Sequence, residues 1–164
     1  MQASIIYHSV SGTTCRCADF ILAGMAKVPG VRGRCMSLDE VDGEYVRESS
    51  LLILGSPVYF ASTSAVVKGW LEQAPQYGLV GKIGGAFATA NYIHGGGEIA
   101  IQSILEHFLV MGMLAYSGGG GLGKPVIHFG PVAIKESVDS FRELFEIYGQ
   151  RMASRALELF PAGQ

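Results

Sequence analysis

Charge is scarce in this sequence, and so are the features that mark nucleic-acid-binding, disulfide-linked and metal-binding proteins. Only 16% of the 164 residues are charged, the net charge is −2, and no segment forms a basic stripe. This composition argues against nucleic acid as a partner. The three cysteines, Cys15, Cys17 and Cys35, are odd in number and lack CxxC spacing. We therefore expect neither a disulfide framework nor a metal site, and we expect a cytoplasmic protein.

Long hydrophobic runs are also missing. The longest apolar stretch, Phe108 to Tyr116, is far too short to span a bilayer. Residues 1–10 have no basic n-region, so they are expected to form a strand and not a signal peptide. No membrane partner is expected.

Hydrophobic residues (49%) and glycine (23 residues) are abundant, and short apolar runs alternate with stretches of helical spacing. Strands are predicted at 4–7, 31–38, 51–54, 83–89 and 113–116, with helices between them that include 62–73 and 98–110. No repeat, linker or change of composition divides residues 1–164, so one domain is expected. The alternation predicts a doubly wound α/β fold with a parallel sheet, in which ligands bind beyond the carboxyl ends of the strands.

The loop after the first predicted strand is rich in hydroxyl groups. It reads Ser9-Val10-Ser11-Gly12-Thr13-Thr14 and leads into a helix, whose N-terminus favours an anion. No Lys or Arg lies in this loop, so a phosphate there would be held by neutral donors. An ordinary capped turn is the alternative, because Ser and Thr are common helix caps.

Two further loops follow predicted strands. In the first, Pro57, Val58, Tyr59 and Phe60 leave a buried strand, and the aromatic rings can flank a planar ligand or simply cover the next helix. In the second, the glycine run suits a close backbone approach to the edge of a ring, and an amide side chain can supply hydrogen bonds. The residues of interest in this loop are Thr89, Ala90, Asn91, Tyr92, Gly95, Gly96 and Gly97. His94 can reach a substrate or be only a solvated loop residue.

Two other patterns do not predict a site. Residues 118–124 match GxxxxGK by letter, but Pro125 stands where a P-loop needs Ser or Thr. The acidic cluster at residues 39–44 lacks metal-ligand spacing and is expected to be a solvated edge.

Together the three loops resemble those of the flavodoxin-like family, especially the branch of NAD(P)H-dependent FMN reductases and multimeric flavodoxins. This branch includes quinone oxidoreductases of the tryptophan-repressor-binding-protein type. The resemblance runs from Ile5 to about Leu157. Its most specific part is residues 54–60, continued by Ser62, Ser64, Ala65, Lys68, Trp70 and Leu71.

The resemblance implies a five-stranded parallel sheet in the order 2-1-3-4-5 and bound flavin mononucleotide (FMN). It places the FMN phosphate at Ser9, Ser11, Gly12, Thr13 and Thr14, within the loop that includes Val10. Residues 57–60 would line the isoalloxazine ring, and residues 89–92 with 95–97 would contact its rim.

The resemblance further implies hydride transfer from NAD(P)H through FMN to a small acceptor such as a quinone, in a chain that can form a homo-oligomer. A flavodoxin-type electron carrier without a substrate of its own is the alternative, and a domain that has lost flavin binding is a third. Related quinone reductases often have an arginine where Tyr59 stands and a histidine where Met111 is expected to fall. The cysteine cluster of related iron–sulfur flavoproteins is absent, and the chain is shorter than the tetrameric quinone reductases.

Overall fold

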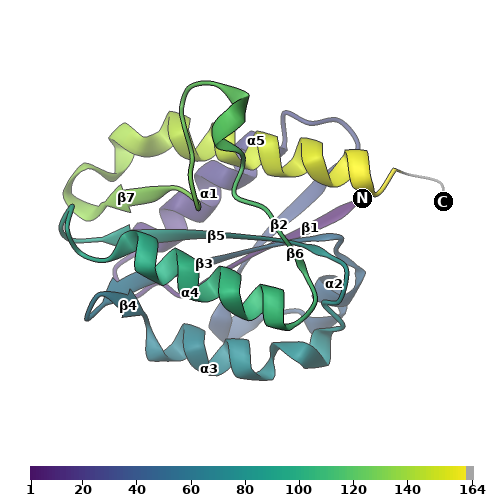
Figure 1. Cartoon of the computed structure of the whole chain (residues 1–164), viewed down its shortest axis with the longest axis horizontal. Coiled ribbons are helices and arrows are strands. Elements are labelled where there is room, and N and C mark those ends of the chain that lie inside the picture. Colours follow the sequence, from purple (N-terminus) through teal and green to yellow (C-terminus); the bar gives the residue numbers. More distant parts are fainter. Residues whose placement is uncertain (162–164) are drawn as a thin grey trace.

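A twisted sheet between two helical layers forms the centre of the molecule in the computed structural model, which describes residues 1–161 (Figure 1). The strands β1 (Gln2–Tyr7), β2 (Arg32–Ser37), β3 (Leu51–Tyr59), β5 (Ile83–Ala90) and β6 (Leu114–Ala115) lie in the order β2-β1-β3-β5-β6. All neighbours along this path pair in parallel. The predicted fold and strand order are confirmed.

Helices cover both faces of the sheet. One layer holds α1 (Thr13–Met25) and α5 (Arg142–Leu159), and the other holds α3 (Ala65–Gln73) and α4 (Gly97–Val110). Successive residues of a strand point to opposite layers: Ile5 packs in the core beneath α1 and α5, and Ile6 packs in the core beneath α3 and α4. Every residue of β5 is buried, which explains why its apolar run has no alternation.

The α1–α5 layer is held by two glycines that bring the helix backbones into contact. A Cβ on Gly24 would lie 1.9 Å from the carbonyl oxygen of Glu146, and one on Gly149 would lie 2.1 Å from that of Ile21. No larger residue fits unless the helices separate. This close packing fixes the N-terminus of α1 beside the segment that precedes α5.

The fifth position in the sheet is split between two short strands. β6 pairs with the start of β5 at Ile83 and Gly84, whereas β7 (Val132–Ile134) pairs with its end at residues 88–90. Residues 116–131 leave the sheet between them and form the excursion seen above the sheet in Figure 1. The prediction of one strand at 113–116 is therefore incomplete, because it misses β7.

Some predicted boundaries are wrong. The helix expected from Ser62 begins at Ala65, because Ser62–Thr63 forms β4, which pairs antiparallel with the end of β3. The acidic cluster is not only a solvated edge: its Asp42 accepts a hydrogen bond of 3.1 Å from the backbone N–H of Tyr45 and so caps α2 (Gly43–Glu48). None of the helices in the described residues is long and apolar enough to cross a membrane.

Candidate functional site at the carboxyl ends of the strands

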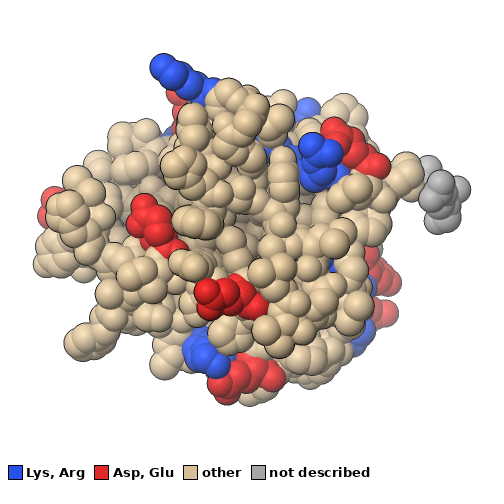
Figure 2. Space-filling view, viewed as in Figure 1, with Lys and Arg blue, Asp and Glu red and all other residues tan. Residues whose placement is uncertain are grey.

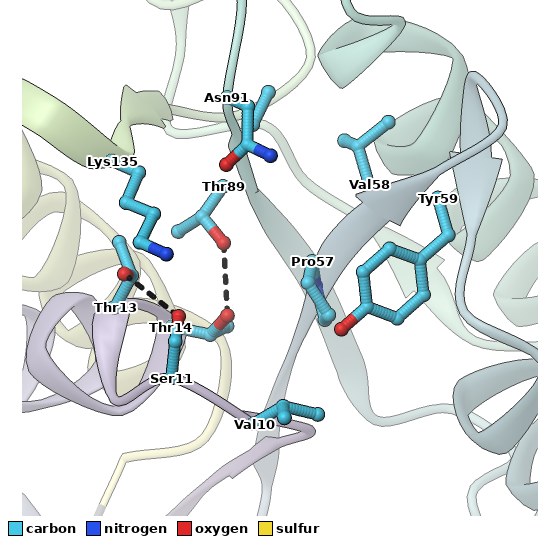
Figure 3. Close-up of a pocket in the computed structure, with 11 residues that line it drawn as sticks. Val10, Ser11, Thr13, Thr14, Pro57, Val58, Tyr59, Thr89, Asn91 and Lys135 are labelled. Carbon is cyan, nitrogen blue, oxygen red and sulfur yellow. Dashed lines mark hydrogen bonds between the residues drawn. The ribbon is translucent and has the colours of Figure 1, made fainter.

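Two adjoining cavities lie beyond the carboxyl ends of β1, β3 and β5. The first has a volume of about 180 Å³ and is lined by Val10, Ser11, Thr13, Thr14, Pro57, Val58, Tyr59, Thr89, Ala90, Asn91 and Lys135 (Figure 3). The second, of about 330 Å³, shares Val58, Tyr59, Ala90 and Asn91 with it and extends to Phe60, Ala61, Tyr92 and Gly95. The fold thus brings the three loops singled out in the sequence to one place.

Hydroxyl groups and a helix N-terminus form one end of the first cavity. Gly12 is the N-cap of α1 and has a φ of 85°, a left-handed conformation that glycine adopts without strain. A glycine cap has no side-chain oxygen, so the N–H groups of Thr13 and Thr14 at the start of the helix stay available to a ligand. Ser9 does not line the cavity, and its Oγ accepts a hydrogen bond of 3.2 Å from the N–H of Cys15.

Thr14 and Thr89 join this helix end to the sheet. Their hydroxyl oxygens are 2.9 Å apart, and both residues are buried. The dashed line between them in Figure 3 marks this hydrogen bond. One hydroxyl must donate to the other, which leaves only one of the two hydrogens for a ligand. The sequence predicts both side chains as ligand contacts but gives no sign of this pairing.

Lys135 is the one charged residue among those that line the first cavity in the described chain. It follows β7 directly, and Figure 3 shows its side chain pointing into the cavity near Thr13. The loop itself has no Lys or Arg, as the sequence shows, but the cavity that it lines includes this lysine, which the prediction of a phosphate held by neutral donors did not consider. Lys135 reaches the cavity only because β7 pairs with β5, and this strand was not predicted. The sequence around Lys135 therefore gives no sign of its position.

Aromatic residues occupy the other end of the site, on the turn between β3 and β4. Phe60 and Ala61 both have positive φ angles, 48° and 60°, which L-residues adopt at a cost. The Phe60 ring is fully exposed, so it does not cover the helix that follows. Tyr59 is held at its side by His8, whose ring meets it edge-on at 6.4 Å and whose Nδ1 lies 2.9 Å from Ser64 Oγ.

The three predicted glycines have different surroundings. Gly95 lines the second cavity, but Gly96 and Gly97 line neither. Gly96 has a φ of 94°, and a Cβ there would lie 2.7 Å from the Cα of Ala61. A Cβ on Gly97 would lie 2.6 Å from a side-chain carbon of Val132. Close packing against Ala61 and Val132 therefore explains why glycine stands at positions 96 and 97, and the sequence alone does not show this.

Two further residues considered in the sequence lie apart from the cavities. His94 is exposed and lines neither cavity. Met111 is the C-cap of α4, whose N-terminus is the end near the site. Because the 14 residues of α4 span about 21 Å, Met111 lies far from the two cavities, and the expectation that it falls beside the flavin site is wrong.

Groups with strongly shifted pKa values lie outside the two cavities in the described chain. A hydrogen bond with the thiol of Cys15 and burial raise the pKa of Tyr7 well above its usual value, and burial raises the pKa of Cys17 and of Cys35 to about 12. Within residues 1–161, no group of three or more His, Cys, Asp or Glu side chains is placed to hold a metal ion. The site offers anion donors and aromatic surface.

The comparisons with known proteins agree with this geometry. Residues 43–122 match the family model described as NADPH-dependent FMN reductase. A flavodoxin from Clostridium saccharobutylicum is 41% identical over 160 residues, which cover 98% of this chain and 100% of that protein. An NAD(P)H dehydrogenase (quinone) from Solidesulfovibrio magneticus is 25% identical, covering 73% of this chain and 75% of that protein.

Solved structures show the same fold. A flavodoxin from the domain Archaea superposes with a TM-score of 0.78 at 23% identity, covering 95% of this chain and 99% of that chain. This chain belongs to the flavodoxin-like family of flavin-binding proteins, as the resemblance of its loops predicted. Within that family its relatives include both flavodoxins and quinone reductases.

Proposed function

We propose that this protein is a flavodoxin-type electron carrier that binds FMN in the two adjoining cavities. The observation that carries the proposal is the order of groups along them: hydroxyls and a helix N-terminus at one end, and aromatic and backbone surface at the other. This order matches a phosphate ester joined to a planar ring. Similarity to a flavodoxin over that protein's full length supports the same function.

The phosphate would lie at the N-terminus of α1. Ser11, Thr13 and Thr14 line the cavity there, and backbone N–H groups and the helix dipole add to their hydroxyls. Hydrogen bonds to a charged ligand contribute about 1.5–3 kcal/mol each. These residues fit a phosphate without a metal ion.

The ring would lie against the turn after β3. Pro57, Val58 and Tyr59 line one side of the cavities, and Asn91 on the neighbouring loop offers an amide for the polar edge of the ring. FMN supplies the reversible uptake and release of electrons when it is bound, while the protein positions it and tunes its potential.

An apolar rim favours a carrier over an enzyme with a substrate pocket. The rim consists of Val10 at the first cavity and of Phe60 and Tyr92 at the second, residues that are between 74% and 105% exposed. Large exposed apolar groups around a site mark surfaces where another protein docks. On the face shown in Figure 2, a few acidic and basic side chains are scattered among uncharged surface. Docking would therefore depend on the rim more than on charge.

A second candidate is an NAD(P)H-dependent FMN oxidoreductase that passes hydride to a small acceptor such as a quinone. The match to the FMN reductase family model favours it. The second cavity is bordered by the exposed Phe60 and Tyr92, so a flavin ring lying there would be within reach of a small acceptor. A homo-oligomer would suit this candidate if a neighbouring copy closed that cavity.

Anaerobic redox experiments on the FMN-loaded protein distinguish the two functions. The carrier should show two well-separated one-electron potentials in a spectroelectrochemical titration. It should be reduced slowly by NADH and NADPH in stopped flow. Rapid reduction by either nicotinamide, followed by turnover with a quinone, would contradict the carrier and support the enzyme.

The role of the rim is tested with a macromolecular acceptor. Phe60→Ser should slow electron transfer from the reduced protein to cytochrome c about threefold or more, because the docking surface loses its most exposed ring. Val80→Ser is the matched control, since Val80 is 79% exposed but packs near Gly112, beyond the far end of α4. If the two substitutions slowed electron transfer equally, the rim would have no specific role in docking.

A further inference from the structure

Among the residues that the structure describes, Lys135 combines a place in the first cavity with a charge that no ion pair satisfies. It is exposed, it lines the hydroxyl end of the first cavity, and none of the ion pairs within residues 1–161 involves it. A charged residue close to it in the chain does have an ion-pair partner. Asp139, on the same 3-10 segment (Lys135–Phe141), pairs with Arg16 of α1 at 2.6 Å.

The position of Lys135 depends on two features of the fold. β7 pairs with the end of β5 at residues 88–90, so the residue that follows β7 emerges beside Thr89. The contact between α5 and α1 through Gly24 and Gly149 keeps that segment against the N-terminus of α1. β7 and α5 thus place Lys135 at the phosphate end of the cavity, although Lys135 is far from the hydroxyl loop in the sequence.

We infer that the ammonium group of Lys135 recognises the charge of the bound phosphate monoester. The inference rests on the proposed function and adds a specificity-determining residue to it. A phosphate monoester carries a charge of about −1.5 to −2 at neutral pH. Hydroxyls and backbone N–H groups supply hydrogen bonds but no net charge. Lys135 compensates part of the phosphate charge and makes the site select a phosphorylated flavin over an uncharged one.

The size of the effect is limited by exposure. A charge-assisted contact with a buried phosphate would be strong, but solvent around Lys135 screens it. We expect a contribution of about tenfold in affinity. Lysine, with a flexible stem and a compact charge, can reach the phosphate without one fixed geometry, so arginine should replace it in large part.

Binding to apo-protein tests the inference without any assay of activity. FMN and riboflavin are titrated at pH 8 by calorimetry into the parent protein and into Lys135→Gln, Lys135→Arg and Lys124→Gln. Lys124 is an exposed lysine of the excursion outside both cavities and serves as the control. Lys135→Gln should bind FMN about tenfold more weakly and riboflavin within about twofold of the parent.

The other variants and added salt complete the test. Lys135→Arg should stay within about threefold of the parent for FMN, and Lys124→Gln should match the parent. Added KCl should weaken FMN binding more steeply in the parent than in Lys135→Gln, because one charge contact is lost. Unfolding midpoints should be equal, since Lys135 is exposed.

The outcomes separate the two proposals. If the parent binds FMN more tightly than riboflavin and Lys135→Gln does so equally well, the role of Lys135 is overturned while the FMN site stands. If Lys135→Gln weakens riboflavin as much as FMN, Lys135 does not read the phosphate. If the parent binds no flavin, both the proposed function and the role of Lys135 are contradicted.

Discussion

Replacing Thr14 by valine removes one hydroxyl at the phosphate end of the site and keeps the size of the side chain. In the structure this hydroxyl is 2.9 Å from that of Thr89, and the two residues are only 2% and 4% exposed. The bond ties the first turn of α1 to the end of β5. Its loss should be measurable in the stability of the apo-protein.

The magnitude follows from what each substitution leaves behind. A neutral hydrogen bond contributes about 0.5–1.5 kcal/mol, and a buried hydroxyl left without a partner costs about 1–3 kcal/mol. Thr14→Val and Thr89→Val should therefore each lower the free energy of unfolding by about 2 kcal/mol. The double variant leaves no orphaned hydroxyl and should lose about 1 kcal/mol, so the coupling energy is about 3 kcal/mol.

Urea unfolding of the four apo-proteins supplies these values, provided that the m-value is unchanged. Thr13→Val is a suitable control. Thr13 is half-buried and its Oγ1 lies 3.4 Å from Ser11 Oγ, so it should change the free energy by less than about 0.5 kcal/mol. Effects of Thr14→Val and Thr89→Val that add to within about 0.5 kcal/mol would refute the coupling.

Three further predictions concern the scaffold. Gly149→Ala should destabilise the protein by about 3 kcal/mol in thermal unfolding, because its Cβ meets the backbone oxygen of Ile21 at 2.1 Å; an unchanged midpoint would contradict the close helix contact. Ala61→Gly should raise the free energy of unfolding by up to about 1 kcal/mol by relieving a φ of 60°, whereas a loss would show that the turn is not strained. Cys17 and Cys35, with pKa values of about 12 from burial, should be alkylated by iodoacetamide at pH 8 far more slowly than a free thiol, and mass spectrometry showing rapid native labelling would count against their burial.

Much of the fold could be predicted because its central strands are buried on both faces. The apolar runs in β3 and β5 need no tertiary information to be recognised, and parallel strands bring their carboxyl ends together. The convergence of the three loops follows from that alone. The sequence also contains the hydroxyl loop as a continuous string, so the anion end of the site was visible.

The remaining parts depend on contacts between distant segments. β7 has only three residues after a glycine-rich excursion, too few for a periodic signal, and Lys135 was missed with it. β4 depends on positive φ angles at Phe60 and Ala61. Because neither residue is glycine, the sequence gives no sign of this turn. The position of Met111 beside the flavin was inferred from a resemblance to quinone reductases. In the structure Met111 follows the whole length of α4 and lies at the other end of the sheet.

The hydroxyl-rich end of the first cavity is proposed to hold the phosphate of FMN. The most direct test of this placement is the affinity of the parent apo-protein for FMN, riboflavin and FAD, measured by quenching of flavin fluorescence. Two or more hydrogen bonds to a charged phosphate should make FMN bind at least about a hundredfold more tightly than riboflavin. FAD should bind more weakly than FMN. Equal affinities for FMN and riboflavin would contradict the account.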